Sequence, residues 1–172
     1  PNAVSKLAVE YYCYIFYELF GLETVGLRYF NVFGPRQDPT SEYAAVIPKF
    51  ATALLRGESP TIYGDGTQSR DFTYVSNVVG ANLLAVTAPG MVGRVFNTAV
   101  GTRYTLLELV AMLNEILGTH IEPVFAPPRP GDVVHSLADI SQIEKCGYEV
   151  EVDFQTGLQK LAEWYTAIRS HT

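Results

Sequence analysis

The spacing of apolar residues along this chain alternates between the period of a helix and that of a strand. Within residues 3–20, Leu7, Tyr11 and Ile15 recur on one face of a helix. The β-branched and apolar run 24–29 then predicts a strand. Further helices are predicted at 48–56, 76–88, 106–117, 139–146 and from 153 onward. Further strands are predicted at 61–63, 71–74, 95–97 and 122–125. Irregular loops are expected at 34–41 and 126–132.

Residues that stabilise helix ends support these boundaries. Thr105 and Glu108 have the spacing of a capping box, and Gly118 suits the left-handed end of the same helix. Alternating helices and strands indicate the α/β class, in which ligand-binding side chains are expected on the loops. The predicted N-caps of three other helices are Ser76, Asp139 and Asp153.

Composition restricts the class of protein and its partners. Charged residues are 17% and apolar residues 48% of the chain, values that indicate a folded domain. The formal net charge of -6 excludes a nucleic-acid-binding surface. No apolar run is long enough to span a bilayer and no secretion signal is present, so we expect no membrane association and a cytoplasmic location. Cys13, Cys146 and the histidines lack metal-ligand spacing, so no metal site is expected.

Two arginines are candidates for binding an anionic ligand. Arg70 follows the predicted turn 64–66, where a planar guanidinium can bind a phosphate with two hydrogen bonds. The alternative for Arg70 is a local ion pair with Asp71 or Asp65. Arg129 lies between two prolines, which stiffen its loop, and the alternative is an ordinary surface loop.

Other polar residues allow both a functional and a structural interpretation. Asn31 follows the strand 24–29, at the edge where open α/β sheets bind ligands, although a turn residue has the same signature. Lys6 lies one turn into the first helix, where a solvated lysine is the alternative. His135, Ser136 and Asp139 are close in sequence but lack a nucleophile elbow, so we do not expect a catalytic triad.

Six short runs occur in a fixed order: Pro1-x-Ala-Val-Ser-Lys6, Arg28 to Gln37, Val46 to Phe50, Ile62 to Val75, Arg129 to Asp132, and His135 to Ile140. This ordered set, which covers nearly the whole chain, resembles the extended short-chain dehydrogenase/reductases of the NAD-dependent epimerase/dehydratase family. The nearest branch is that of the UDP-N-acetylglucosamine/UDP-glucose 4-epimerases, and the similarity is to their C-terminal half.

This resemblance implies the C-terminal part of a Rossmann-type α/β fold with its small α/β substrate-binding domain. Residues 1–34 would be a remnant of the NAD-binding Rossmann domain, namely the active-site helix and the following strand. Residues 35–172 would be mainly the nucleotide-sugar-binding domain, with some segments returning to the Rossmann sheet. The helix 3–20 would help to form a homodimer.

The resemblance also implies a role for each site residue. Lys6 would contact the nicotinamide ribose of NAD and lower the pKa of a catalytic tyrosine, and Phe30 would line the nicotinamide side. Asn31 would bind the UDP-sugar near its diphosphate. The remaining substrate-binding residues would be Val46, Ile47, Pro48, Thr61, Ile62 and Tyr63 around the uridine, Arg70 and Arg129 on the diphosphate, and Asp132 on the ribose.

One position departs from the pattern of the family. The family places a tyrosine four residues before the lysine, and Asn2 stands four residues before Lys6 here. An asparagine amide cannot ionise, and loss of a general base typically slows a reaction by about 10²–10⁴-fold. The glycine-rich loop that holds the NAD pyrophosphate is also missing from the sequence. We therefore expect an internal fragment of an enzyme that is inactive as it stands.

The function that the resemblance implies is NAD-dependent epimerisation of UDP-glucose or UDP-N-acetylglucosamine at C4, through a 4-keto intermediate. A nucleotide-sugar dehydratase or a UDP-glucuronate decarboxylase of the same superfamily is the alternative enzyme. An alternative of another class is a catalytically silent fragment that binds UDP-sugars or dimerises.

Overall fold

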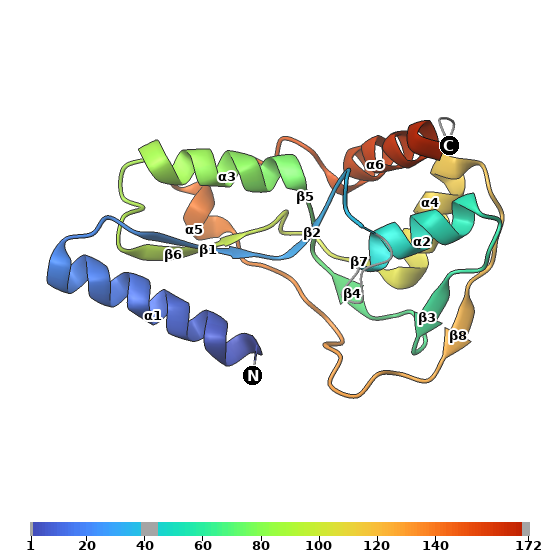
Figure 1. Ribbon diagram of the computed structural model, residues 1–172, viewed down its shortest axis with the longest axis horizontal. Coiled ribbons are helices and arrows are strands. Elements are labelled where there is room, and N and C mark those ends of the chain that lie inside the picture. Colours follow the sequence, from blue (N-terminus) through green and yellow to red (C-terminus); the bar gives the residue numbers. More distant parts are fainter. Residues whose placement is uncertain (1, 39–44, 170–172) are drawn as a thin grey trace.

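Two groups of buried apolar residues divide the fold into two lobes. The computed structural model describes residues 2–38 and 45–169 of the chain. The larger core contains Phe33, Phe50, Phe72, Leu109 and Phe154 among others. The smaller core includes Met91, Phe96, Ile143 and Tyr148. The smaller core lies beneath α3 in one lobe and the larger core among α2, α4 and α6 in the other (Figure 1).

The elements follow the predicted alternation of helices and strands, so the α/β class is confirmed. The helices are α1 (Asn2–Phe20), α2 (Val46–Leu55), α3 (Val75–Thr87), α4 (Leu106–Leu117), α5 (Ser141–Glu144) and α6 (Phe154–Arg169). The strands are β1 (Val25–Tyr29), β2 (Asn31–Phe33), β3 (Thr61–Tyr63), β4 (Ser69–Arg70), β5 (Phe72–Tyr74), β6 (Arg94–Thr98), β7 (Tyr104–Thr105) and β8 (Val124–Ala126).

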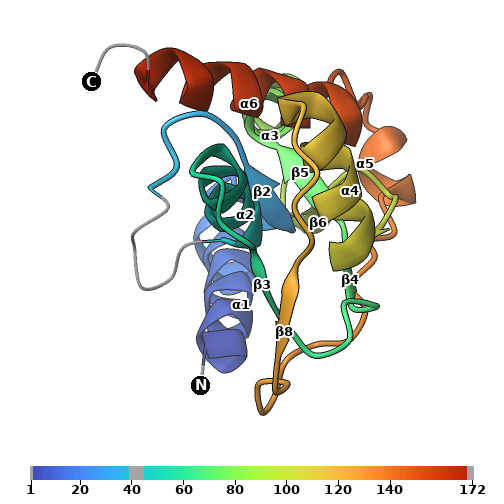
Figure 2. The same cartoon turned by 90° about the vertical axis from the view of Figure 1, so that its right-hand side faces the viewer.

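The strands pair across long sequence separations. Three pairs are parallel, β1 with β6, β2 with β5 and β3 with β8, and one is antiparallel, β4 with β7. In Figure 1, α3 and α1 lie on opposite sides of the β1–β6 pair. Figure 2 shows β3 and β8 side by side below the helices of the larger core. The first lobe is therefore completed by residues 94–98, far along the chain from β1.

Some predicted boundaries and caps are wrong. Ser76 does not cap α3, because that helix begins at Val75 and Tyr74 is its N-cap. Asp139 does not cap α5 either; its carboxylate accepts the Ser141 N–H at 2.9 Å, while Ile140 is the N-cap. The predicted strand 71–74 begins one residue later, because Asp71 separates β4 from β5. The predicted loop 34–41 is described only as far as Asp38, and its end lies outside the described residues.

The local capping predictions elsewhere are confirmed. Thr105 and Glu108 exchange both hydrogen bonds of the capping box, and Gly118 has a φ of 65° at the end of α4. Asp153 accepts the Thr156 N–H at 2.7 Å at the start of α6. These contacts involve residues within four positions of one another, which is why the sequence pattern predicts them.

The apolar face predicted for α1 is present but uncovered. Tyr11 is 61% exposed, Leu7 47% and Ile15 43%, although their spacing is that of a buried face. Cys13 on the same helix is half-buried. Val9, Tyr12 and Phe20 are exposed as well, outside the face of Leu7, Tyr11 and Ile15, so the spacing does not identify what packs against α1.

Phe154 is the centre of the larger core. Its ring stacks on Tyr104 with centroids 4.4 Å apart and on Phe72 at 5.1 Å, and it meets Phe33 edge-on at 5.6 Å. Gly157, one turn later in α6, lets the helix approach these rings, because a Cβ there would lie 2.8 Å from Phe33 and 3.0 Å from Tyr74.

This close approach gives a test of the packing with a matched control. We expect Gly157→Ala to lower the free energy of unfolding by about 1–3 kcal/mol, since overpacking of the aromatic core outweighs the gain in helix propensity. Gly80→Ala, inside α3 with open space around its Cβ, should raise it by about 0.5–1 kcal/mol. Urea denaturation of both variants measures the two changes, and equal stabilisation by both would contradict the predicted clash.

Candidate functional site

A cavity of about 390 Å³ opens beside the larger core. Its walls come from β2, the start of α2, β3, β4 and the loop that follows β8. Apolar side chains such as Phe33 and Phe72 form part of the wall. Eight of the residues predicted to bind substrate line it: Asn31, Val46, Ile47, Thr61, Tyr63, Arg70, Arg129 and Asp132.

Two residues expected near the uridine do not line the cavity. Ile62 is fully buried in the larger core, because side chains of a strand alternate and Thr61 and Tyr63 take the outward positions. Pro48 is buried on the inner side of α2. The wall at these segments is therefore formed by Val46 and Ile47 on α2 and by Thr61 and Tyr63 on β3.

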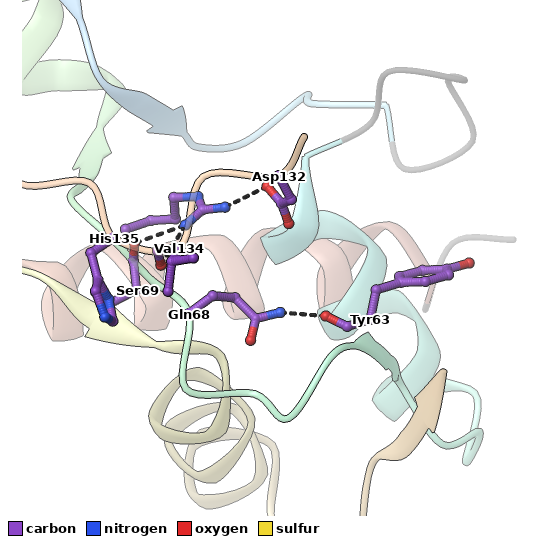
Figure 3. A network of polar contacts seen from close by, with 7 residues as sticks. Tyr63, Gln68, Ser69, Asp132, Val134 and His135 are labelled. Carbon is purple, nitrogen blue, oxygen red and sulfur yellow. Dashed lines mark hydrogen bonds and ion pairs between the residues drawn. The ribbon is translucent and has the colours of Figure 1, made fainter. Parts of the chain in front are cut away.

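Arg70 lies on β4 and is held by three hydrogen-bond acceptors. Its Nη2 donates to Asp132 Oδ1 at 2.7 Å, while Nη1 donates to the carbonyl oxygens of Ser69 at 2.9 Å and Val134 at 3.2 Å. The alternative partners Asp71 and Asp65 are therefore not the ones found. The ion pair joins β4 to the loop after β8 across 62 residues of sequence (Figure 3).

Arg129 reaches the cavity from the loop after β8. Its guanidinium carbon lies 3.8 Å from the centre of the Tyr63 ring, a cation–π contact between the loop and β3. Gly131, with a φ of 78°, and the Asp132 N–H to Arg129 carbonyl hydrogen bond of 3.3 Å shape the turn that presents it. The two arginines therefore reach one cavity from separate segments.

Asn31 begins β2 directly after β1 ends. Its backbone N–H donates to the Asp71 carbonyl at 3.2 Å, and its side chain is exposed at the cavity. The amide can donate to an oxyanion or a hydroxyl group.

Asp71 is the residue that the sequence interpretation missed, since it considered Asp71 only as a strand residue and a possible partner of Arg70. The residue is fully buried, and its carboxylate accepts N–H groups from Val100 at 3.0 Å, Gly101 at 3.0 Å and Ala138 at 3.4 Å. Burial raises the pKa of Asp71, and the three N–H donors act in the opposite direction. Its signal in the sequence is an acidic residue directly before the strand Phe72–Tyr74, which contains two aromatic residues.

The loop 132–136 is attached to β4 through Ser69. The Ser69 N–H donates to the Val134 carbonyl at 2.9 Å, and the Ser136 N–H donates to the Ser69 carbonyl at 3.0 Å. His135 Nδ1 lies 2.9 Å from Ser69 Oγ, so this histidine contacts β4 and forms no triad with Ser136 and Asp139 (Figure 3).

The two residues expected near the cofactor lie outside this cavity. Lys6 lines a separate hollow with Glu10, Arg28 and Tyr29, at the carboxyl end of β1. Arg28 Nε and Nη2 donate to the two Glu10 carboxylate oxygens at 2.7 and 2.6 Å, which attaches α1 to β1. Phe30 is partly buried and packs against the smaller core.

The described part of the chain contains neither a metal-binding cluster nor a membrane-spanning helix. Across ranges 2–38 and 45–169, His, Cys, Asp and Glu side chains form no group of three that could hold a metal ion. None of the helices in these ranges is long and apolar enough to cross a bilayer.

Comparison with known proteins gives consistent matches. Residues 1–99 match the model of the NAD dependent epimerase/dehydratase family. A putative UDP-glucose 4-epimerase of Methanocaldococcus jannaschii is 36% identical over 95% of this chain and 52% of its own length. A dTDP-glucose 4,6-dehydratase of an Actinoplanes species is 34% identical over 99% of this chain and 52% of its own length. The chain thus spans about half the length of the curated relatives it matches.

A solved structure has the same fold. The UDP-N-acetylglucosamine 4-epimerase from Methanobrevibacter ruminantium M1, in complex with UDP-N-acetylmuramic acid, superposes with a TM-score of 0.91 at 45% identity. The match covers 96% of this chain and 53% of that one. The chain therefore corresponds to part of a Rossmann-type extended short-chain dehydrogenase fold.

The buried carboxylate provides a prediction for this site. We expect Asp71→Asn to lower the free energy of unfolding by about 1–3 kcal/mol, because an amide turns N–H donors toward a position where backbone N–H groups need an acceptor. Asp65→Asn is the control, since Asp65 is exposed and accepts hydrogen bonds from Thr67 within its own turn. Urea denaturation compares the two, and equal stability of both variants would contradict the role given to Asp71.

Proposed function

Since this chain belongs to the NAD dependent epimerase/dehydratase family, we propose that it supplies the UDP-sugar site of a nucleotide-sugar 4-epimerase. The observation that carries the proposal is the convergence of Arg70, Arg129 and Asn31 on one cavity from three segments of the chain. A pair of guanidinium groups with an amide beside them matches the charge and the hydrogen-bonding capacity of a diphosphate.

The remaining walls suit the other parts of a uridine diphosphate. Val46 and Ile47 on α2, with Thr61 and Tyr63 on β3, provide a mostly apolar surface for the base. Asp132 provides a carboxylate for the ribose hydroxyl groups. The volume of about 390 Å³ lies within the range of roughly 300–1,000 Å³ that is usual for small-molecule sites.

Lys6 fits a contact with NAD. It lies beside β1 at the carboxyl end of that parallel strand, which is where open α/β sheets bind nucleotides. NAD, when bound, would supply the hydride acceptor for C4 of the sugar. In this assignment Lys6 would bind a ribose hydroxyl, and Phe30, the residue after β1, would line the nicotinamide side.

Asn2 supports a second function of another class, binding of UDP-sugars without turnover. The position four residues before Lys6 would have to remove the proton from the sugar 4-hydroxyl, and an asparagine amide cannot. Among enzymes, a nucleotide-sugar dehydratase or a UDP-glucuronate decarboxylase is the alternative. The similarity to a dTDP-glucose 4,6-dehydratase supports keeping it.

A homodimer and a cytoplasmic location complete the proposal. The exposed apolar side chains of α1 provide a surface for a second copy, with Tyr11, Phe16 and Leu19 among them. Cys13 and Cys146, both unpaired, are compatible with a reducing compartment.

Titration calorimetry with UDP tests the binding site. We expect the chain to bind UDP, and Arg70→Ala and Arg129→Ala to weaken binding by roughly 10- to 100-fold each, since a charge-assisted hydrogen bond contributes about 1.5–3 kcal/mol. Arg56→Ala, which removes the same charge from an exposed residue just after α2, should leave the affinity unchanged. Unchanged affinity in both cavity variants would exclude the diphosphate assignment.

Incubation of the chain with UDP-glucose and NAD tests the absence of turnover. We expect no UDP-galactose by chromatography even when UDP binding is saturated, because Asn2 provides no base. Formation of the 4-epimer would show that another group removes the proton, and would reject the silent-binding alternative.

A further inference from the structure

Arg70, expected to bind the diphosphate, already has an anionic partner in the chain itself. The Asp132 carboxylate accepts from Arg70 Nη2 at 2.7 Å, at the wall of the cavity. A ligand phosphate must therefore replace this carboxylate or share the guanidinium with it.

The two side chains of this ion pair differ in how firmly the surrounding protein holds them. The Arg70 side chain is 14% exposed and is also fixed by the carbonyl oxygens of Ser69 and Val134. The Asp132 side chain is 47% exposed, and Arg70 is its hydrogen-bond partner in the structure. Replacement of the ion pair would therefore move Asp132 and leave Arg70 in place.

The same short turn brings opposite charges to the cavity. Arg129 and Asp132 are joined by the hydrogen bond from the Asp132 N–H to the Arg129 carbonyl, and Gly131 between them adopts a φ of 78°. An anion drawn to Arg129 consequently enters a cavity whose wall also carries the Asp132 carboxylate, and the two negative charges repel each other.

From this arrangement we infer that Asp132 makes the cavity selective for nucleoside diphosphates over inorganic anions of the same charge, such as pyrophosphate. This inference rests on the proposed function. A nucleoside diphosphate brings a ribose diol, whose two O–H groups give the displaced carboxylate new donors. Pyrophosphate brings none, so Asp132 loses its guanidinium and remains close to an anion without compensation.

Asp132 has opposite effects on the binding of the nucleotide and of pyrophosphate. Removing the charge of Asp132 takes away a favourable contact with the nucleotide and an unfavourable one with the inorganic anion. The two affinities should therefore change in opposite directions, which a residue that merely holds the loop in place cannot produce.

Calorimetry with UDP and with pyrophosphate at fixed ionic strength tests this. Asp132→Asn keeps the shape and removes the charge. We expect pyrophosphate to bind about three- to tenfold more tightly and UDP about three- to tenfold more weakly than to the wild-type chain. Asp139→Asn makes the same change of charge at an exposed residue outside the cavity lining and should alter neither affinity.

The other outcomes have distinct meanings. If Asp132→Asn lowers the affinities for UDP and pyrophosphate equally, Asp132 only positions Arg70, and the proposed selectivity is overturned. Unchanged affinities would overturn it as well. Failure of the wild-type chain to bind UDP would reject the proposed function, and the selectivity with it. Near-UV circular dichroism of each variant verifies that the fold is retained.

Discussion

The buried carboxylate of Asp71 is the interaction on which the arrangement of the site depends. It accepts backbone N–H groups from the segment after β6 and from the segment before α5, while its own carbonyl accepts the Asn31 N–H. A carboxylate in an apolar interior is stable only with such donors. One residue therefore fixes the relative positions of the strand that carries Arg70, the start of β2 and the chain that continues from the Asp132 loop.

The charges of the site work against the charge of the whole chain. With a net charge of -6, the chain has no general attraction for an anionic ligand, so the diphosphate binding proposed above depends on the few cations in the cavity wall. Arg70 and Arg129 are each already engaged, one with Asp132 and the other with the Tyr63 ring. These contacts hold the guanidinium groups in position before a ligand arrives, which reduces the entropy that binding must remove.

The sequence allowed prediction of features that depend on neighbouring residues. The capping box at Thr105 and Glu108 and the cap at Asp153 are local and were found as predicted. Ser76 was predicted as a cap by residue type, and the structure starts α3 one residue earlier instead. The alternation of Thr61, Ile62 and Tyr63 contained the information that Ile62 faces the core, although the prediction assigned all three residues to the ligand.

The features that could not be predicted depend on distant parts of the chain. The sequence offered Asp71 or Asp65 as alternative ionic partners of Arg70 because they are near in the chain, whereas the pairing of β3 with β8 brings the loop with Asp132 to β4. The helix at α1 was predicted correctly, and its exposed apolar side chains show that helical spacing contains no information on what covers them. Residue chemistry therefore singled out the arginines as candidates, and only the fold identified what they contact.

A short stretch of backbone links the first strand pair to the second. The consecutive N–H groups of Phe30 and Asn31 donate to different partners, the Thr98 carbonyl of β6 and the Asp71 carbonyl beside β5. The chain thus passes from the first strand pair to the second within one residue, at the carboxyl end of β1. Lys6 lies near this end on one side and the cavity with Arg70 on the other. Because both N–H groups are bonded, the backbone between Lys6 and the cavity is held at this point by hydrogen bonds to two different strand pairs.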